Sequence, residues 1–537
     1  MTGAGPSMGQ AGAYGGLERV PTGIAGLDEI LGGGLFRGGV YIVQGTPGSG
    51  KTIFGNQACY THAGASPAYE DMGASPAYED MGASPAYEDR GASPATCDPG
   101  AAPEHRALYV TLLAESHARM LGHIAPLGFF RPDLIPDRIT YLSAFRTLQD
   151  GGLAGLLTLL RRETAHREAS LVVLDGLVAA EETAASTLEF KTFIHELQTQ
   201  AAATGATVLL LTSASAGADL VAAEHTMVDG LIVLSSRLAG WRAEREIEVR
   251  KFRGGGFLRG RHAFRITDDG VRVFPRIEAR LRVPSRRDPV EGPALTTGLP
   301  PLDAMLGGGL PHASTTLVGG PAGIGKTTLG LQFLGADPEA PGLLCGFYES
   351  EAALLAKARA LALPVAGLIE RGRVGVMWQP ATEGLIDEVC DDLLRDIRNR
   401  GVRRVFIDGL DAMSRIAGDQ DRIVRIFAAL TAELRALGVT AMYTRETDLR
   451  GTFVDAPSGS GSLRQTSSVA ENVVLMRSCA LRSGRHRLIA VAKVRDARID
   501  PRLRVFDIRP GGLAIDDGPD RAEAILADRD APSRGGE

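Results

Sequence analysis

Two copies of one eight-residue pattern decide the fold: GTPGSGKT at Gly45–Thr52 and GPAGIGKT at Gly320–Thr327. Both match the phosphate-loop pattern G-x-x-x-x-G-K-[ST], in which glycines allow backbone N–H groups to close around phosphate oxygens. The lysine of each loop can reach the β- and γ-phosphates, and the final threonine can place its hydroxyl on Mg²⁺. The residues predicted to bind the nucleotide are Gly45, Thr46, Pro47, Gly48, Ser49, Gly50, Lys51, Thr52, Gly320, Pro321, Ala322, Gly323, Ile324, Gly325, Lys326 and Thr327.

The repetition extends upstream of both loops. PTGIAGLDEILGGGL occupies residues 21–35 and TTGLPPLDAMLGGGL occupies residues 296–310, so the lead-ins share the 275-residue offset of the loops. In each copy, a triple glycine before a β-branched run predicts a turn into a buried strand. The loop then opens a helix, whose N-terminal end favours a phosphate group. We therefore expect a duplicated nucleotide-binding domain of α/β class.

Length and composition are consistent with this expectation. At 537 residues the chain exceeds one typical hydrophobic core, and its 44% apolar content suits a soluble α/β protein. The five cysteines are scattered, which argues against a disulfide framework or zinc site and predicts a cytoplasmic location. No apolar run reaches the ~18 residues of a membrane span. The net charge of −6 predicts no general affinity for nucleic acid.

Turn-forming and polar segments divide the chain. Glycine, proline and charged residues at the two ends predict mobile tails, and a polar stretch with two prolines predicts a linker. The predicted parts are a disordered tail at 1–16, a first domain at 17–284, a linker at 285–293, a second domain at 294–517 and a disordered tail at 518–537.

A nine-residue tandem repeat, GASPAYEDM, starts at Gly64 and makes residues 63–105 a predicted low-complexity insertion. The spacing of the nucleotide motifs agrees. Lys51 precedes Asp175 by 124 residues, whereas Lys326 precedes Asp408 by 82, a difference of 42. A neutral expansion in a surface loop is favoured over a partner-binding role.

An aspartate ends an apolar run in each half of the chain. LVVLD at 171–175 and RVFID at 404–408 are typical of buried parallel strands. Ligands of open α/β sheets bind at the carboxyl ends of such strands. The predicted Mg²⁺ ligands are therefore Thr52, Asp175, Thr327 and Asp408.

Each half also places Glu-Ser after an apolar strand pattern, in LYVTLLAES at 108–116 and GLLCGFYES at 342–350. We predict that Glu115 and Glu349 activate the nucleophile that attacks the γ-phosphate. The alternative is a solvated glutamate at a helix start, where the helix dipole favours a negative charge. Recurrence in both halves favours the catalytic interpretation.

A basic cluster occurs late in each half, in EVRKFRG at 248–254 and AVAKVRDAR at 490–498. One interpretation is a charged sheet edge that prevents aggregation. The other is that these residues reach the γ-phosphate bound by a neighbouring subunit, as an arginine finger does. The residues concerned are Lys251, Arg253, Lys493 and Arg495.

These motifs, in this order and twice, resemble the KaiC family of RecA-like ATPases over residues 17–515, the insertion excluded. The resemblance implies two tandem RecA-like P-loop domains, each a mostly parallel sheet flanked by helices. It also implies a homohexamer with ATP and Mg²⁺ at subunit interfaces, slow hydrolysis and signalling partners. In clock members the second domain phosphorylates itself, and QTSSVAENVVLM at 465–476 places Ser467 and Ser468 at the phosphorylated pair.

The chain departs from the family at one point. Clock-type members carry two adjacent glutamates at the catalytic strand end, and here Ala114 and Tyr348 replace the first of them. A KaiC-like signalling ATPase is therefore expected rather than a clock oscillator. Two alternatives stay open: a DNA-acting recombinase or helicase, for which no zinc module, helix-turn-helix or basic tail is found, and a non-catalytic scaffold that binds ATP structurally.

Overall fold

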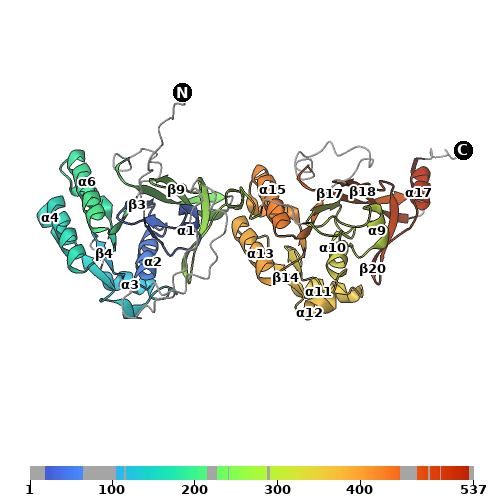
Figure 1. Cartoon of the computed structure of the whole chain (residues 1–537), viewed down its shortest axis with the longest axis horizontal. Helices are drawn as coiled ribbons and strands as arrows, with labels where there is room; N and C mark the ends of the chain where they lie inside the picture. Colours follow the sequence, from blue (N-terminus) through green and yellow to red (C-terminus); the bar gives the residue numbers. More distant parts are fainter. Residues whose placement is uncertain are drawn as a thin grey trace, which may run out of the picture. The chain divides into compact units, whose positions relative to one another are not determined.

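The computed structural model describes residues 18–64, 105–113, 116–213, 226–239, 241–286, 291–447, 468–481, 484–495 and 497–530. The predicted tail at 1–16, residues 65–104 of the insertion, Glu115 and Ser467 lie outside these ranges. The chain forms two compact units, which divide between Pro275 and Arg276 (Figure 1). Among the described helices, none combines the length and apolar character that a membrane crossing requires.

The first unit is built on a mixed sheet. Its strands are β3 (Val40–Gly45), β4 (Ala107–Thr111), β5 (Ile139–Ser143), β6 (Leu171–Asp175), β7 (Thr207–Ser213), β8 (Gly230–Ala239), β9 (Arg242–Phe252), β10 (Arg261–Thr267) and β11 (Gly270–Phe274). Their order is β11-β10-β9-β8-β3-β7-β6-β4-β5. The strands from β8 to β5 in this order pair in parallel, and β9, β10 and β11 continue the sheet antiparallel.

Helices cover both faces of this sheet (Figure 1). They are α1 (Leu27–Leu31), α2 (Lys51–Gly64), α3 (His117–Ile124), α4 (Phe145–His166), α5 (Leu177–Thr183) and α6 (Thr187–Thr204), and a small sheet pairs β1 (Arg19–Val20) with β2 (Leu35–Phe36). Successive residues of β3 enter different cores, because side chains alternate across a strand. Tyr41 and Val43 pack with α2, whereas Val40 and Ile42 pack with α4 and α6.

The second unit repeats this topology. Its strands are β12 (Thr315–Gly320), β13 (Gly342–Gly346), β14 (Val374–Trp378), β15 (Arg404–Asp408), β16 (Thr440–Glu446), β17 (Asn472–Leu481), β18 (Gly484–Val494), β19 (Arg504–Arg509) and β20 (Gly512–Ile515). Their order, β14-β13-β15-β16-β12-β17-β18-β19-β20, is that of the first unit strand for strand. The predicted fold class, two tandem domains with mostly parallel sheets, is confirmed.

The helices of the second unit are α8 (Ile277–Arg280), α9 (Pro300–Met305), α10 (Lys326–Gly335), α11 (Glu351–Ala360), α12 (Val365–Glu370), α13 (Ile386–Arg400), α14 (Leu410–Ala417), α15 (Gln420–Ala436) and α17 (Asp520–Asp530). Helix α10, which follows the second phosphate loop, lies very close to the sheet. A Cβ on Gly330 would lie 2.1 Å from the ring of Phe406 on β15. Glycine is therefore required for this packing distance.

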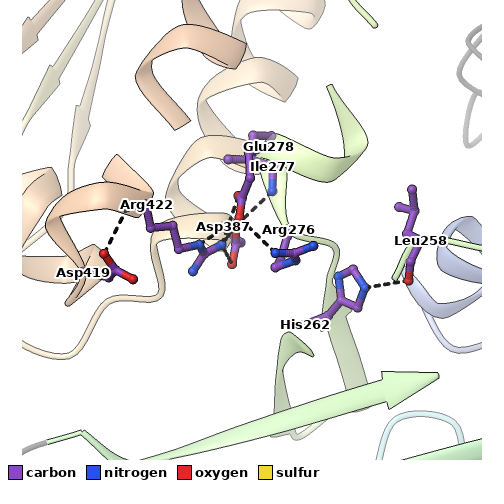
Figure 2. Close-up of polar contacts among 8 residues, drawn as sticks. All are labelled: Leu258, His262, Arg276, Ile277, Glu278, Asp387, Asp419 and Arg422. Atoms are coloured by element: carbon purple, nitrogen blue, oxygen red, sulfur yellow. Dashed lines mark hydrogen bonds and ion pairs between the residues drawn. The ribbon is translucent and has the colours of Figure 1, made fainter. Parts of the chain in front are cut away.

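Residues 276–286, which we call the strap, pack within the second unit. Ile277 is fully buried in the core between α13 and α15, and its N–H donates to Asp387 Oδ1 at 3.0 Å. Figure 2 shows Arg422 of α15 bound to both Asp387 oxygens, at 2.6 and 2.7 Å, and to Glu278 at 3.1 Å. These contacts fix α8 to both helices by a buried apolar residue and a charged network.

The strap continues to Ser285, whose N–H donates to Glu433 Oε2 at 2.8 Å. Glu433 is fully buried and also pairs with Arg398 at 2.7 Å. The sequence assigns these residues to the first domain and the start of the linker, and the predicted domain limits stay a prediction. The packing shows only that the strap is part of the second compact unit.

The C-terminal segment differs from its sequence-based expectation. Residues predicted as a disordered tail from 518 include helix α17, which covers Asp520–Asp530. Ala522 and Ile525 lie one turn apart on this helix and pack against Cys479, Leu488 and Val505. Two apolar side chains on one face are enough to dock a short helix that its charged sequence does not reveal.

Candidate functional site

Both phosphate loops join the central strand of a sheet to a helix. β3 runs into the first loop and β12 into the second, and α2 and α10 begin at the loop lysines. Gly48 and Gly50 have φ of 77° and 101°, and the corresponding angles of Gly323 and Gly325 are 73° and 118°. Only glycine adopts such angles without strain. Because each helix begins at the loop lysine, the N–H groups of its first turn point toward the loop, as an anion site requires.

The loop lysines fold back over their own loops. Lys51 Nζ donates to the carbonyl oxygens of Gly45 and Thr46 at 2.8 and 2.9 Å, and Lys326 makes the two equivalent bonds at the same distances. Burial lowers the pKa of both lysines, and nearby carboxylates oppose this, Asp175 in the case of Lys51. Each cation thus stands where the bound phosphates are expected.

The structure brings each predicted threonine and aspartate together. Thr52 Oγ1 donates to Asp175 Oδ2 at 3.2 Å, and Thr327 Oγ1 donates to Asp408 Oδ2 at 2.7 Å. Asp175 is the last residue of β6, and β7 lies between β6 and β3 in the sheet. In the same way, Asp408 is the last residue of β15, and β16 lies between β15 and β12. A hydroxyl and a carboxylate at the carboxyl end of a parallel sheet form the oxygen donor set that Mg²⁺ prefers.

Each aspartate has a second partner, which the sequence did not reveal. Tyr109 of β4 donates to Asp175 at 2.8 Å, and Thr444 of β16 donates to Asp408 at 2.6 Å. β4 and β16 lie on opposite sides of the aspartate strands in the common topology. The two units therefore support the same carboxylate from different neighbouring strands. Tyr109 is fully buried, and burial and Asp175 raise the pKa of its hydroxyl, which stays a donor.

The space above the two loops, and an unpaired hydroxyl in the first of them, also fit a nucleotide. Nothing lies within 4 Å of a Cβ built on Gly48 or Gly323, so the top of each loop is open. Ser49 Oγ is buried, and it has no hydrogen-bond partner among the described residues. An open loop with an unsatisfied donor and a nearby lysine fits a polyanionic ligand such as a triphosphate.

In each of the two Glu-Ser pairs, the serine has a structural role. Ser116 and Ser350 are the N-caps of α3 and α11, accepting from the N–H groups three residues on at 3.4 Å. Capping explains why a serine recurs in both halves. Glu349 lies before its cap, about one third exposed, and Lys357 Nζ binds its Oε1 at 2.5 Å. Glu115 lies outside the described residues.

The basic clusters do not lie at the loops of their own units. Lys251 is opposite Leu231, which is opposite Ile42, so it is level with the start of β3 rather than with the loop that follows its end. Lys251 Nζ donates to Thr226 O at 2.7 Å, and Arg253 donates to the same oxygen at 2.8 Å. The antiparallel course of β9 takes Arg253 further from the loop.

The second cluster is arranged in the same way. Lys493 is opposite Val473, which is opposite Leu317 near the start of β12. Lys493 Nζ donates to Ala470 O at 2.7 Å. Arg495 is exposed. Ser468, the described member of the predicted phosphorylated pair, is exposed two residues before Ala470.

Comparisons with known proteins agree with this arrangement. The KaiC ATPase family matches residues 20–68, 128–278 and 295–520. The circadian clock oscillator protein KaiC of Picosynechococcus sp. is 26% identical over 540 aligned residues, which cover 97% of this chain and 94% of that protein. The KaiC proteins of Rippkaea orientalis and Prochlorococcus marinus are each 25% identical, with 95% of this chain covered and 91% and 95% of theirs. The chain belongs to the KaiC ATPase family.

Proposed function

We propose that the chain is a cytoplasmic, Mg²⁺-dependent ATPase with one nucleotide site in each unit and a signalling role. The observation that carries the proposal is the convergence, in both units, of a loop lysine, a loop threonine and a strand-end aspartate. Membership of the KaiC family supports ATP hydrolysis. The names of the relatives, circadian clock oscillator proteins, support a regulatory role in the cell.

In this proposal the loop N–H groups and lysines hold the triphosphate, and Thr52 and Thr327 hold the metal with Asp175 and Asp408. Bound MgATP supplies a polarised γ-phosphate. Water, oriented by Glu115 or Glu349, forms a bond to the γ-phosphorus as the bond to the bridging oxygen breaks. ADP leaves with that electron pair, and the water gives its proton to the glutamate that orients it. The products are ADP and phosphate.

Calorimetry with MgATP tests the two sites separately. The parent chain should bind two nucleotides, and Lys51→Ala and Lys326→Ala should each bind one, because each removes one phosphate ligand. Lys191→Ala, in α6 and outside both sites, is the matched control and should bind two. Binding of two nucleotides by both loop variants would contradict the proposal.

We further propose a homohexamer in which Lys251, Arg253, Lys493 and Arg495 act on ATP held by the neighbouring subunit. The support is their register, which puts Lys251 and Lys493 level with the starts of β3 and β12 and away from their own loops. Native mass spectrometry with and without MgATP tests the assembly, since a ligand bound by two subunits stabilises it.

Mixing experiments test the action between subunits. Arg253→Ala should bind ATP but lose at least tenfold in first-site hydrolysis, because a trans arginine stabilises the transition state. Its control is Arg250→Ala, an exposed arginine of β9 three residues earlier. Mixing Arg253→Ala with Lys51→Ala subunits should restore activity, since each supplies the part that the other lacks. No restoration in mixed hexamers would refute the trans role.

We propose serine autokinase activity for the second unit, with Ser467 and Ser468 as acceptors. Support comes from Ser468, which is exposed and close in sequence to the carbonyl bound by Lys493. The serine hydroxyl would give its proton to Glu349, its oxygen would bond to the γ-phosphorus, and the bond from that phosphorus to the bridging oxygen of ADP would break. Phosphopeptide mapping after incubation with γ-labelled ATP should find label in these serines and none after Ser468→Ala with Ser467→Ala. Ser478→Ala, exposed on β17, should keep the label.

A non-catalytic scaffold is the second candidate, and one observation favours it. The carboxylate of Glu349 is held by Lys357, and Tyr348 occupies the position of the other family glutamate. Under this alternative, ATP would stabilise the assembly without being consumed. Tight binding of two nucleotides with no phosphate release over hours, unchanged by Glu349→Gln, would favour the scaffold over the ATPase.

A further inference from the structure

A small cavity lies beside Asp175 in the first unit. It is lined by Thr111, Leu113, His117, Met120 and Asp175. Its volume of about 10 Å³ is close to the space that one water molecule needs. A hydroxyl, an imidazole and a carboxylate are among its walls, and a buried water needs two to four such polar partners. The cavity is therefore a site for one water next to the proposed metal ligand.

His117 faces this cavity from the first turn of α3. Its Nε2 lies 2.9 Å from Thr111 Oγ1, and its ring lies 5.9 Å from that of Tyr141. The bond with Thr111 uses one ring nitrogen, and no hydrogen bond to the other, Nδ1, is found within the described residues. Burial lowers the pKa of His117, which favours the neutral ring. In the tautomer whose Nε2 donates to Thr111, the lone pair of the ring is on Nδ1.

The register fixes how this histidine relates to the aspartate. Thr111 is the direct cross-strand neighbour of Asp175, because β4 and β6 pair in parallel at their carboxyl ends. A side chain bonded to Thr111 from the following helix therefore lies over the strand ends, where ligands of such sheets bind. His117 meets this condition through Nε2.

The corresponding positions of the second unit carry different residues. The cross-strand neighbour of Asp408 is Gly346, which has no hydroxyl. The residue after the N-cap Ser350 is Glu351, which is exposed, where His117 follows Ser116. The hydroxyl and the imidazole that line the cavity of the first unit are therefore not present at these two positions of the second unit.

We propose that His117 is a catalytic residue of the first nucleotide site and holds the attacking water in the cavity that it shares with Asp175. This inference rests on the proposed ATPase function. The water oxygen bonds to the γ-phosphorus, and the bond to the bridging oxygen of ADP breaks. The proton of the water leaves through Nδ1 of His117 to solvent, so in the first site His117 replaces Glu115 as the acceptor of this proton. In the sequence, His117 follows three residues after Ala114, which replaces the family's first glutamate.

The test uses the full chain with Lys326→Ala, so that the first site alone is measured. In this parent, His117→Ala is compared with His123→Ala, an exposed histidine of the same helix. Two quantities besides turnover are measured by calorimetry: the affinity for MgATP and the affinity for MgADP with aluminium fluoride, which mimics the transition state. Thermal unfolding checks that the variants fold.

We expect His117→Ala to lower phosphate release at least tenfold and the affinity for the transition-state mimic by a similar factor. Affinity for MgATP should change less than twofold. Equal turnover and mimic affinity in His117→Ala and His123→Ala would overturn the inference while leaving the ATPase proposal intact. A parent chain that binds MgATP without releasing phosphate would overturn both.

A second variant separates catalysis from structure. His117→Gln can keep a hydrogen bond to Thr111 because its terminal amide reaches the place of Nε2, but it lacks an atom at Nδ1. If the histidine only braces α3, glutamine restores hydrolysis, and the inference is wrong. If Nδ1 holds the water, His117→Gln folds and binds ATP as the parent does but stays at least tenfold slower.

Discussion

Tyr109 donates its hydroxyl hydrogen to Asp175 across 2.8 Å, to the same oxygen that accepts from Thr52. One carboxylate oxygen is therefore held by two hydroxyls from different elements. In the second unit, Thr444 binds the other oxygen of Asp408 instead. The two sites share the proposed metal ligands but not the groups that orient them, so the properties of each site can be changed separately.

Removing these orienting hydroxyls should affect one site each. Tyr109→Phe should weaken MgATP binding and hydrolysis at the first site about tenfold to a hundredfold, because a hydrogen bond to a charged group is worth roughly 1.5–3 kcal/mol. Thr444→Val should do the same at the second site. Each variant is the control for the other, and calorimetry resolves the sites. Equal losses at both sites in either variant would contradict the assignment.

Gly330→Ala should destabilise the second unit. The added methyl would lie 2.1 Å from the ring of Phe406, which is fully buried and has no room to move, so overpacking should cost about 3 kcal/mol. Gly122→Ala is the control, since nothing lies within 4 Å of its added methyl in α3. That change should be neutral or gain up to about 1 kcal/mol from helix propensity. Denaturant unfolding measures both, and an unchanged midpoint for Gly330→Ala would refute the close contact.

The charged network of the strap should be sensitive to loss of one partner. Arg422→Met leaves Asp387, only 2% exposed, without its cation and should cost the second unit about 3–5 kcal/mol. Combining it with Asp387→Asn should recover part of this loss, because the buried charge of Asp387 is then removed. Arg425→Met, exposed on the same helix, is the control. A double variant as unstable as Arg422→Met alone would argue against the ion pair.

Acid should destabilise the first unit through His62. Burial, with His105 and Arg37 adding to it, lowers the pKa of His62 to about 4, and Ser170 Oγ lies 2.7 Å from its Nε2. Between about pH 6.5 and pH 4 the unfolded chain therefore binds a proton that the folded chain does not. Stability is lost as the pH falls through this window, by about 2 kcal/mol between pH 7 and pH 5.

The measurement compares the unfolding free energy of the first unit at pH 7 and pH 5 in the parent and in His62→Gln. The variant lacks the titrating ring, so the difference between the two pH values should shrink by about 2 kcal/mol. His166→Gln, at the end of α4, serves as control and should leave the difference unchanged. An identical pH dependence in parent and His62→Gln would exclude His62 as the source.

Local patterns predicted the fold, and the threonine and aspartate that they assign to each site lie in contact. The phosphate loops, the apolar runs that end in Asp175 and Asp408 and the doubled order of motifs are short-range signals, and parallel topology then brings them together. Tyr109 and Thr444 could not be found in this way. A tyrosine or threonine in an apolar strand is common, and its role depends on which strands become neighbours.

The packing of the strap and the presence of helix α17 were not predicted from the sequence, for a related reason. α8 has only four residues, too few for a helical period, and the partner of Ile277 lies 110 residues away. The sequence of α17 is typical of a charged tail, because only Ala522 and Ile525 pack against the rest of the unit. Short elements are stabilised by the surface that receives them, and a sequence window does not contain that surface.

The strap also determines what backbone cleavage would do to the protein. A protease cutting between Arg286 and Glu291 would sever the chain, yet the new end of the first half would remain seated in the second through Ile277, Glu278 and Ser285. The cleaved protein should then run as two fragments on a denaturing gel and as a single species in native buffer. The strap would act as a peptide ligand that holds the first fragment to the second without a covalent bond.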